Sequence, residues 1–400
     1  MTSTTHKTGA CVSRWWQGAA ALLGLLMLLS SCGGGGVGEG GTGSFASGPI
    51  SGFGSVHVGG IRFDDSRIAS VAVEDEPTSV PRSALRPGMV VAIEAGEIRT
   101  DAAGVRRATA QRIVLAGSLR GPVTDVQWPT KQLRVLGLPV RFNAATVFDD
   151  RLREQIRESG RILDQVVEVW GYVDRSGVVP QFVATHMASA VGASTYKARG
   201  FVREVDDELV RLGDQWFDFS GVSGLPAVGD FVWLRVQPGS GDPAWQVQAW
   251  ATIDRSDFTE GHRLKIEGTV TALADERHFR VDGIPIVAEQ AVAGLAEGRY
   301  VEVEGTWQAG ALRATEIDLK TDDELEERLS EWEGTVSEVD TVLRRFTLTT
   351  DGGQSVAVRY DDATVFDGGS AANLTPGARL EVNGVLRDGV LLAREIEFDD

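Results

Sequence analysis

The chain has 400 residues and is acidic, with 57 aspartates and glutamates against 39 lysines and arginines and a formal net charge of −18. A surface of this sign lacks the electrostatic attraction that dominates nucleic-acid affinity, and it also opposes direct adsorption to anionic lipid headgroups. The composition therefore excludes nucleic acid as the expected partner, although solubility alone is also a sufficient reason for a net negative charge.

The first 31 residues are typical of a secretory signal peptide. Lys7 and Arg14 precede an apolar run at residues 18–29, which is shorter than the roughly 20 residues that a membrane-spanning helix needs. The run leads into Leu29-Ser-Ser-Cys32, which resembles a bacterial lipobox, so Cys32 is the predicted lipid-attachment residue. The alternative is an ordinary secreted protein in which this cysteine occurs by chance. Two or more acyl chains on one residue would anchor the protein stably to a membrane, since each buried methylene contributes about 0.8 kcal/mol.

A glycine-rich tether is predicted over residues 32–47, because this segment cannot bury enough apolar surface to offset its backbone entropy. Gly33 follows the cysteine where an aspartate would resemble a signal for inner-membrane retention. We therefore expect a lipid-anchored protein of the cell envelope, in the outer membrane, facing the periplasm or the surface. Cys11 leaves with the signal and Cys32 is acylated, so the mature chain has no thiol for a disulfide or a cysteine-type metal site.

Five repeats follow the tether. Their opening signature, Gly-x-[Val/Ile], starts at Gly48, Gly121, Gly200, Gly268 and Gly334. A later signature, [Val/Leu]-Glu-Val-x-Gly, ends at Gly171, Gly305 and Gly384. A Leu-x-x-Gly turn precedes this strand in several copies, and an Ala-x-x-[Ile/Met] strand closes most of them. Two copies also share Thr-Val-Phe-Asp, ending at Asp149 and Asp367. The predicted repeats span residues 48–117, 118–196, 197–262, 263–328 and 329–400.

These motifs, in this order, resemble the domain of unknown function 5666 family. The resemblance covers nearly the whole mature chain. The family occurs as tandem copies in secreted and lipid-anchored bacterial proteins, so the resemblance implies a small β-barrel module at the cell envelope. It implies no catalytic residues.

The residue pattern predicts an all-β fold, because glycines and prolines punctuate short runs of period-two alternation. Helical spacing is confined to residues 151–165 and 322–332. The first of these segments lies between the Thr-Val-Phe-Asp strand and the Val-Glu-Val strand, where an oligonucleotide/oligosaccharide-binding (OB) barrel has its helix. We therefore expect a tandem array of about five small, five-stranded, OB-like β-barrels. A generic small barrel is the alternative.

No constellation of residues indicates a reaction, a metal or a cofactor. The histidines of the mature chain, His57, His186, His262 and His278, show no i, i+4 pairing. The paired aspartates lack the ligand pattern of an EF-hand loop, and a solvated turn explains them as well. There is no Gly-x-Ser-x-Gly elbow. Three hypotheses remain: a non-catalytic scaffold that binds an unidentified envelope protein, a glycan- or peptidoglycan-binding protein, and a hydrolase with a site built from loops.

Three tryptophans stand where other repeats have polar residues at outward positions of a strand. They are Trp170, Trp233 and Trp250. Outward indole rings stack on sugars or anchor a partner, so these residues are the candidate binding residues. The alternative is that they pack one repeat against another. Trp332 aligns with an isoleucine and is predicted to lie in a core.

Overall fold

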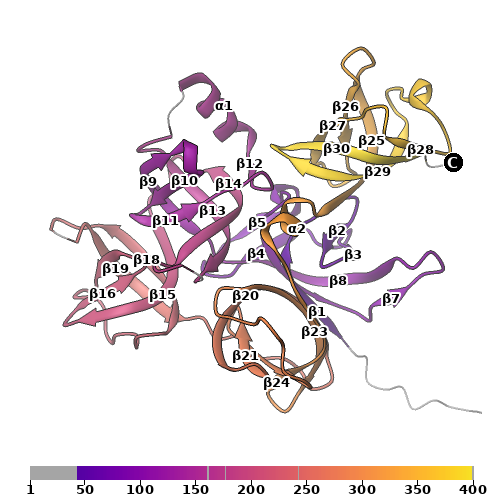
Figure 1. Ribbon diagram of the computed structural model, residues 1–400. Coiled ribbons are helices and arrows are strands. Elements are labelled where there is room, and N and C mark those ends of the chain that lie inside the picture. Colours follow the sequence, from indigo (N-terminus) through magenta and orange to yellow (C-terminus); the bar gives the residue numbers. More distant parts are fainter. Residues whose placement is uncertain (1–42, 160–161, 176, 242, 399–400) are drawn as a thin grey trace, which may run out of the picture. The chain divides into compact units, whose positions relative to one another are not determined.

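The computed structural model describes residues 43–159, 162–175, 177–241 and 243–398, and these ranges consist mostly of β-strands (Figure 1). They form five barrels, which we number in chain order, and barrels 2 to 5 are closed by continuous strand pairing. The two helices are short and lie in connections between strands. The signal peptide, Cys32 and most of the predicted tether lie outside the described residues.

The strands of each barrel follow one another along the chain. Barrel 1 contains β1 (Ser44–Pro49), β2 (Val56–Val58), β3 (Ile61–Asp64), β6 (Val90–Ala95) and β8 (Arg106–Leu115), with the additional strands β4 (Ser70–Val73), β5 (Ser79–Pro81) and β7 (Arg99–Thr100). Barrel 2 contains β9 (Leu119–Gln127), β10 (Gln132–Val135), β11 (Leu138–Arg141), β13 (Val166–Asp174) and β14 (Gln181–Ser189), with β12 (Val147–Phe148) and the helix α1 (Asp150–Ser159). Barrel 3 contains β15 (Tyr196–Asp206), β16 (Leu209–Leu212), β17 (Gln215–Asp218), β18 (Phe231–Pro238) and β19 (Trp245–Thr252).

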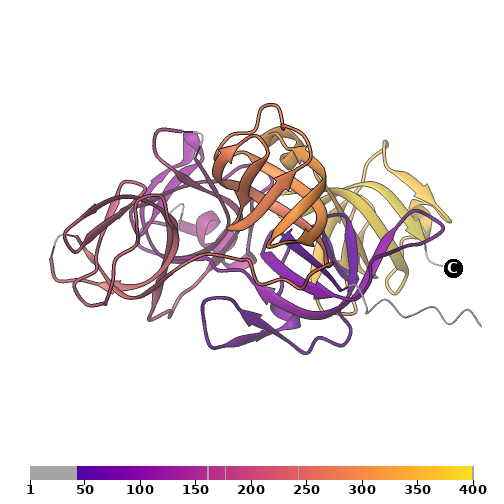
Figure 2. The same cartoon turned by 90° about the horizontal axis from the view of Figure 1, so that it is seen from below.

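Barrels 4 and 5 complete the described chain. Barrel 4 contains β20 (Arg263–Asp275), β21 (His278–Val281), β22 (Ile284–Ala288), β23 (Tyr300–Gln308) and β24 (Ala311–Leu319). The helix α2 (Asp322–Glu326) leads to barrel 5, which contains β25 (Leu329–Asp340), β26 (Arg345–Thr349), β27 (Ser355–Arg359), β29 (Arg379–Arg387) and β30 (Val390–Phe398), with the short strand β28 (Val365–Asp367). Figures 1 and 2 show barrels 4 and 3, respectively, as rings of strands.

Barrels 2 to 5 share one closed strand order, and barrel 1 follows it except that β1 and β2 form no ladder and their connection is bridged only between Gly52 and His57. The first strand pairs with the second, the second with the third, the third with the fifth, the fifth with the fourth, and the fourth with the first. The pairing of third and fifth strands is parallel in every barrel, as for β22 with β24 and β27 with β30. This is the Greek-key order of a five-stranded OB barrel. The predicted array of OB-like barrels is therefore confirmed.

The backbone geometry of the fourth strand explains why the Val-Glu-Val-x-Gly signature ends in glycine. In barrels 2, 4 and 5 the ladder between the fourth and fifth strands shifts register at this residue, which marks a β-bulge. A Cβ at Gly171, Gly305 or Gly384 would lie 1.9, 2.1 or 2.2 Å from a carbonyl oxygen of the fifth strand. Only glycine allows this approach of the two backbones.

In several other barrels, the Leu-x-x-Gly turn lies at the position that helix α1 occupies in barrel 2. Leu85 and Leu374 are buried in this turn, whereas Leu152 of α1 is fully buried in barrel 2. Both predicted helices end earlier than expected: α1 stops at Ser159, and α2 stops at Glu326 because β25 begins at Leu329.

The tether also ends earlier than expected. Residues 44–47, predicted to be flexible, belong to β1 and are buried. The reason is that β1 finds a partner on each edge, pairing antiparallel with β6 of its own barrel and parallel with β20 of barrel 4. Barrels 1 and 4 thus share one continuous sheet, and barrels 2 and 3 share another through Arg120 and Lys197.

Barrels 1 and 5 share one core cluster. The ring centroids of Phe53 and Trp332 lie 5.2 Å apart, and Trp332 is 1% exposed, which agrees with its predicted core position. The backbone N–H of Phe53 donates to the carbonyl of Glu331 at 3.0 Å, and the N–H of Glu333 donates to the carbonyl of Phe53 at 2.8 Å. The connection between β1 and β2 therefore adds a short bridge to the edge of β25.

Candidate functional site

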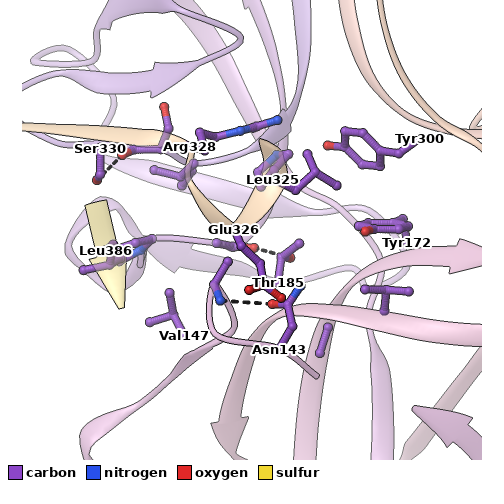
Figure 3. Close-up of a pocket in the computed structure, with 18 of the residues that line it drawn as sticks. Asn143, Val147, Tyr172, Thr185, Tyr300, Leu325, Glu326, Arg328, Ser330 and Leu386 are labelled. Carbon is purple, nitrogen blue, oxygen red and sulfur yellow. Dashed lines mark hydrogen bonds between the residues drawn. The ribbon is translucent and has the colours of Figure 1, made fainter. Parts of the chain in front are cut away.

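A cavity of about 90 Å³ lies among residues of barrels 1, 2, 4 and 5 and of the segment that contains α2 (Figure 3). Most of its lining side chains are apolar: Pro49, Ile50, Pro87, Ala145, Val147, Val183, Ala184, Leu325, Leu329 and Leu386. Its polar lining groups include Asn143, Thr185, Glu326, Arg328 and Ser330. A mostly apolar pocket with a few polar groups is the usual form of a small-molecule site.

Two tyrosines form one wall of this cavity. The ring centroids of Tyr172 and Tyr300 lie 4.6 Å apart, and the hydroxyl of Tyr300 donates to Oε2 of Glu267 at 3.2 Å. Arg328 approaches the same oxygen of Glu267 at 2.5 Å. Burial raises the pKa of both phenols, so both stay protonated. Burial opposes charge on Arg328, but Glu267 outweighs it and raises its pKa. This wall can bind and orient a ligand, but it provides no group suited to proton transfer near neutral pH.

A tight contact between barrels 1 and 2 also borders this cavity. The hydroxyl of Thr185 donates to the carbonyl of Gly88 at 2.5 Å and to that of Trp170 at 3.2 Å. Gly88 has a φ of +78°, and a Cβ there would lie 2.3 Å from the carbonyl oxygen of Thr185. The backbone of the loop before β6 therefore packs directly against the backbone of β14.

Buried charges join barrel 1 to barrels 2 and 3. The connection between β4 and β5 carries Glu74, Asp75 and Glu76, which we call the acidic clasp. Nζ of Lys197 lies 2.9 Å from Oδ1 of Asp75 and 3.1 Å from Oε1 of Glu76. Arg120 of β9 lies 2.6 Å from the same oxygen of Glu76. Because the side chain of Lys197 is 3% exposed, this network is largely removed from water.

Glu74, the first residue of the acidic clasp, contacts the connection between barrels 3 and 4 through Arg255. It accepts a hydrogen bond from the backbone N–H of Gly117 at 2.8 Å and forms an ion pair with Arg255. Burial opposes its charge, but Arg255 and Arg199 outweigh this effect and lower the pKa of Glu74 to about 2. Burial likewise raises the pKa of Asp282, against the influence of the same two arginines. Glu74 thus stays ionised at neutral pH and pairs with the positive charges of Arg255 and Arg199.

The three candidate tryptophans occupy different environments, and the structure does not bring them together into one site. Trp170 is 4% exposed and belongs to the core cluster of barrels 1 and 5, so it points out of its own barrel and is covered by another. Trp250 is half-buried against the core of its own barrel, barrel 3, and its ring centroid lies 6.0 Å from that of Phe219. Trp233 is half-buried beside Arg199 and Arg255.

Sequence reasoning missed the most connected residues. In the sequence alone, the acidic clasp is indistinguishable from many other acidic turns, and Lys197 is indistinguishable from a solvent-exposed lysine beside a strand. Trp216 on β17 was also missed. It is half-buried, with the guanidinium of Arg211 5.6 Å from its ring centroid. The only available signal was its position on the third strand, which contributes to the ligand-binding face of an OB barrel.

The predicted lipid-attachment residue, Cys32, lies outside the described residues. Within the described ranges, no helix is long and apolar enough to cross a membrane. The same ranges contain no group of three or more His, Cys, Asp or Glu side chains placed to hold a metal ion.

Comparison with known proteins adds a family. The model of a domain of unknown function, DUF5666, matches residues 120–187, 267–318 and 333–397, which correspond to barrels 2, 4 and 5. No curated protein matches the chain significantly. Among solved structures, the chain is similar to a multidomain protein with nucleic acid binding domains from Streptococcus pneumoniae TIGR4, at 11% identity over 51% of this chain and 73% of that chain. The TM-score is 0.13, which is too low to support an argument.

Proposed function

The chain belongs, through residues 120–187, 267–318 and 333–397, to the family of the domain of unknown function DUF5666, and from this premise we propose that it is a non-catalytic, lipid-anchored scaffold of the cell envelope. Its barrels present surfaces to an unidentified envelope protein, and Cys32 carries the lipid that attaches the array to the outer membrane. The array binds no nucleic acid, because its net charge of −18 opposes the phosphate backbone.

The acidic clasp, in which the side chain of Asp75 pairs with the buried Lys197, is the observation that supports this proposal. Side chains from barrel 1 pair with Arg120 of barrel 2, with Lys197 of barrel 3 and with Arg255, which follows barrel 3. Removing one member of a buried ion pair is costly, so such contacts hold their elements in a fixed relation. A flexible string of independent barrels would need none of them. Fixed barrels favour a scaffold, because a partner that contacts two barrels then loses less entropy on binding.

Lipid attachment is tested by labelling cells with a fatty-acid analogue. The wild type is expected to incorporate the label and to fractionate with the outer membrane, whereas Cys32→Ser is expected to be unlabelled and released. Equal labelling of the two proteins would exclude the anchor.

The scaffold itself is tested by cross-linking the tagged full chain in its own envelope and identifying what it captures. A reproducible protein partner, captured by the wild type and lost in a clasp variant such as Lys197→Met, supports the scaffold. Retention on purified peptidoglycan without a protein partner would favour the second candidate.

That second candidate is glycan or peptidoglycan binding, and half-buried tryptophans on barrel 3 favour it. Trp216 lies on the third strand and Trp250 on the fifth. Aromatic rings at the surface of an OB barrel are suited to stacking on sugars. Sedimentation with peptidoglycan, compared between wild type and Trp216→Ser, distinguishes this function from the scaffold. A hydrolase with a loop-built site is the third and least supported candidate.

A further inference from the structure

The cavity among barrels 1, 2, 4 and 5 can be reached from solvent. Leu329, which lines it, is 52% exposed, and the lining side chains of Asn143, Leu325, Glu326 and Leu386 are half-buried rather than buried. In Figure 3, Glu326 points from α2 into the space between the lining residues. A molecule that enters the cavity therefore contacts apolar side chains and a carboxylate directly.

The serine and threonine hydroxyls of the lining have partners within the chain. The hydroxyl of Thr185 donates to the carbonyl of Gly88 at 2.5 Å, and that of Ser330 donates to the carbonyl of Ser51. The hydroxyl of Ser51 donates to the carbonyl of His57 at 3.3 Å. None of these groups requires a ligand, so they do not determine what the cavity binds.

Two charged side chains line the cavity, and their charges do not cancel. The guanidinium of Arg328 lies 2.5 Å from Oε2 of Glu267, a residue that is 3% exposed and lies outside the lining, so the charge of Arg328 is neutralised within the chain. The side chain of Glu326 has neither a hydrogen-bond partner nor an ion-pair partner among the described residues. The cavity is thus left with one carboxylate that has no counter-charge.

An unpaired carboxylate beside apolar side chains favours a cationic ligand. Apolar surroundings weaken the solvation of a charge, and an opposite charge that also donates hydrogen bonds compensates for this loss. An ammonium group provides both, because it has three N–H donors and no acceptor. A carboxylate or phosphate ligand is disfavoured, since it would meet Glu326 with a charge of the same sign.

The volume of the cavity limits the apolar part of the ligand. An apolar cavity of about 150 Å³ holds benzene, which has six carbon atoms. In proportion, the volume of about 90 Å³ holds about four carbon atoms. Leu325, Leu329 and Leu386 line this space, so a short aliphatic chain fits it better than a polar one does.

We propose that this cavity binds a primary ammonium group on an aliphatic chain of about four carbon atoms. The ammonium group pairs with Glu326, and the chain lies among the three leucines. Small alkylamines and the lysine side chain share this chemistry, so the ligand is either a free amine or a lysine of a bound protein. The inference does not depend on the scaffold function, because a free amine requires no protein partner.

The test is a titration of the full chain, carrying ¹³C-labelled leucine methyl groups, with n-butylammonium and with n-butanol at pH 7. We expect butylammonium to bind with a dissociation constant in the millimolar range, while butanol, which has the same length but no charge, binds about tenfold more weakly. Glu326→Gln should weaken the binding of butylammonium about tenfold and leave that of butanol unchanged. Glu327→Gln is the matched control, because its side chain is 64% exposed and does not line the cavity.

Ala145→Leu distinguishes binding in the cavity from an ion pair at the surface. The larger side chain occupies part of the space and keeps Glu326, so both ligands should lose about tenfold in affinity. The acetylated methylamide of lysine identifies the source of the amine, because affinity equal to that of butylammonium indicates a lysine of a protein and much weaker affinity indicates a free amine. The proposal is overturned if butylammonium does not saturate the wild type at tens of millimolar, if butanol binds equally well, or if either Glu326→Gln or Ala145→Leu binds butylammonium as tightly as the wild type does.

Discussion

Nζ of Lys197 lies 2.9 Å from Oδ1 of Asp75, and the two side chains are 3% and 4% exposed. The residues belong to different barrels and are 122 positions apart in the chain. Two further carboxylates, of Glu76 and Glu168, lie 3.1 and 3.5 Å from the same ammonium group. Lys197 is therefore the shared cation of three buried or half-buried anions, and the two members of the pair are not equivalent.

Lys197→Met should destabilise the protein by about 3–5 kcal/mol, because it leaves the buried Asp75 without its ion-pair partner and leaves Glu76 and Glu168 with Arg120 alone. Asp75→Asn should cost less, since Lys197 keeps two partners. Urea denaturation of both variants measures the difference. Arg99→Met is the control, because its ion pair with Glu97 is 82% and 61% exposed and should change stability by less than about 0.5 kcal/mol. Equal losses for Lys197→Met and Arg99→Met would show that the clasp does not hold the barrels together.

The sequence predicted the barrels but not this joint, for a physical reason. Strand alternation and the glycine at a β-bulge are local requirements, so Gly305 and its equivalents repeat in the sequence wherever the barrel repeats. An ion pair between Asp75 and Lys197 repeats nowhere, and its acidic partner is one of 57 aspartates and glutamates. Trp170 shows the same limit, because period-two alternation predicts that it leaves its own barrel but not that the core cluster of barrels 1 and 5 receives it.

The contact between barrels 1 and 5 should depend on pH through Glu331. Arg62 pairs with Glu331 and donates to both carboxylate oxygens of Glu381, at 3.1 and 2.9 Å. Burial, followed by Glu381, raises the pKa of Glu331 to about 7, although Arg62 and Arg107 oppose the shift. The folded state thus prefers the protonated carboxyl. Its contribution to stability is complete below the ordinary pKa of 4.5 and is lost as the pH rises through 7.

His57, 3.8 Å from Glu331, acts in the opposite direction. Burial, followed by Arg62 and Arg107, lowers its pKa to about 3, so its contribution is complete above pH 6.5 and is lost as the pH falls towards 3. The two effects partly cancel between pH 4.5 and 6.5, and a variant is needed to separate them.

Glu331→Gln isolates the effect of the carboxyl. The difference in unfolding free energy between this variant and the wild type should be constant below about pH 4.5 and should then shift in favour of the variant up to about pH 7. Thermal unfolding followed at intervals of pH measures it. Glu316→Gln, at an exposed position of β24, should show no such trend. A constant difference for Glu331→Gln across this range would contradict the raised pKa.

Trp250→Ser should lower stability by about 1–3 kcal/mol, because the ring packs against Phe219 and the core of barrel 3. Trp233 borders a pocket beside Arg199 and Arg255, so Trp233→Ser should cost less. Melting temperatures of both variants, with peptidoglycan sedimentation in parallel, separate packing from binding. If both variants melt well below the wild type and neither affects binding, the tryptophans of barrel 3 have a structural role only.

The contribution of the contact between barrels 1 and 2 to stability can be measured at Gly88, because Gly60 provides a control glycine with a similar backbone conformation. Gly88 and Gly60 both have positive φ angles, of +78° and +69°. Alanine is therefore strained at either position, by about 1 kcal/mol or more. A Cβ at Gly60 meets nothing within 4 Å, whereas a Cβ at Gly88 would lie 2.3 Å from the carbonyl oxygen of Thr185 in barrel 2.

The loss of stability in Gly88→Ala beyond that in Gly60→Ala thus reports the contact between the barrels and not the backbone strain. We expect an excess of about 1–3 kcal/mol in urea denaturation, because the loop before β6 must move away and the hydrogen bond from Thr185 to Gly88 is lost with it. Thr185→Val removes the hydrogen bonds to Gly88 and Trp170 without a steric clash and should account for about 1 kcal/mol of the excess. If Gly88→Ala and Gly60→Ala lose the same stability, the close approach of Gly88 to β14 does not contribute to the joint, and the two barrels are held together by their charged and apolar contacts alone.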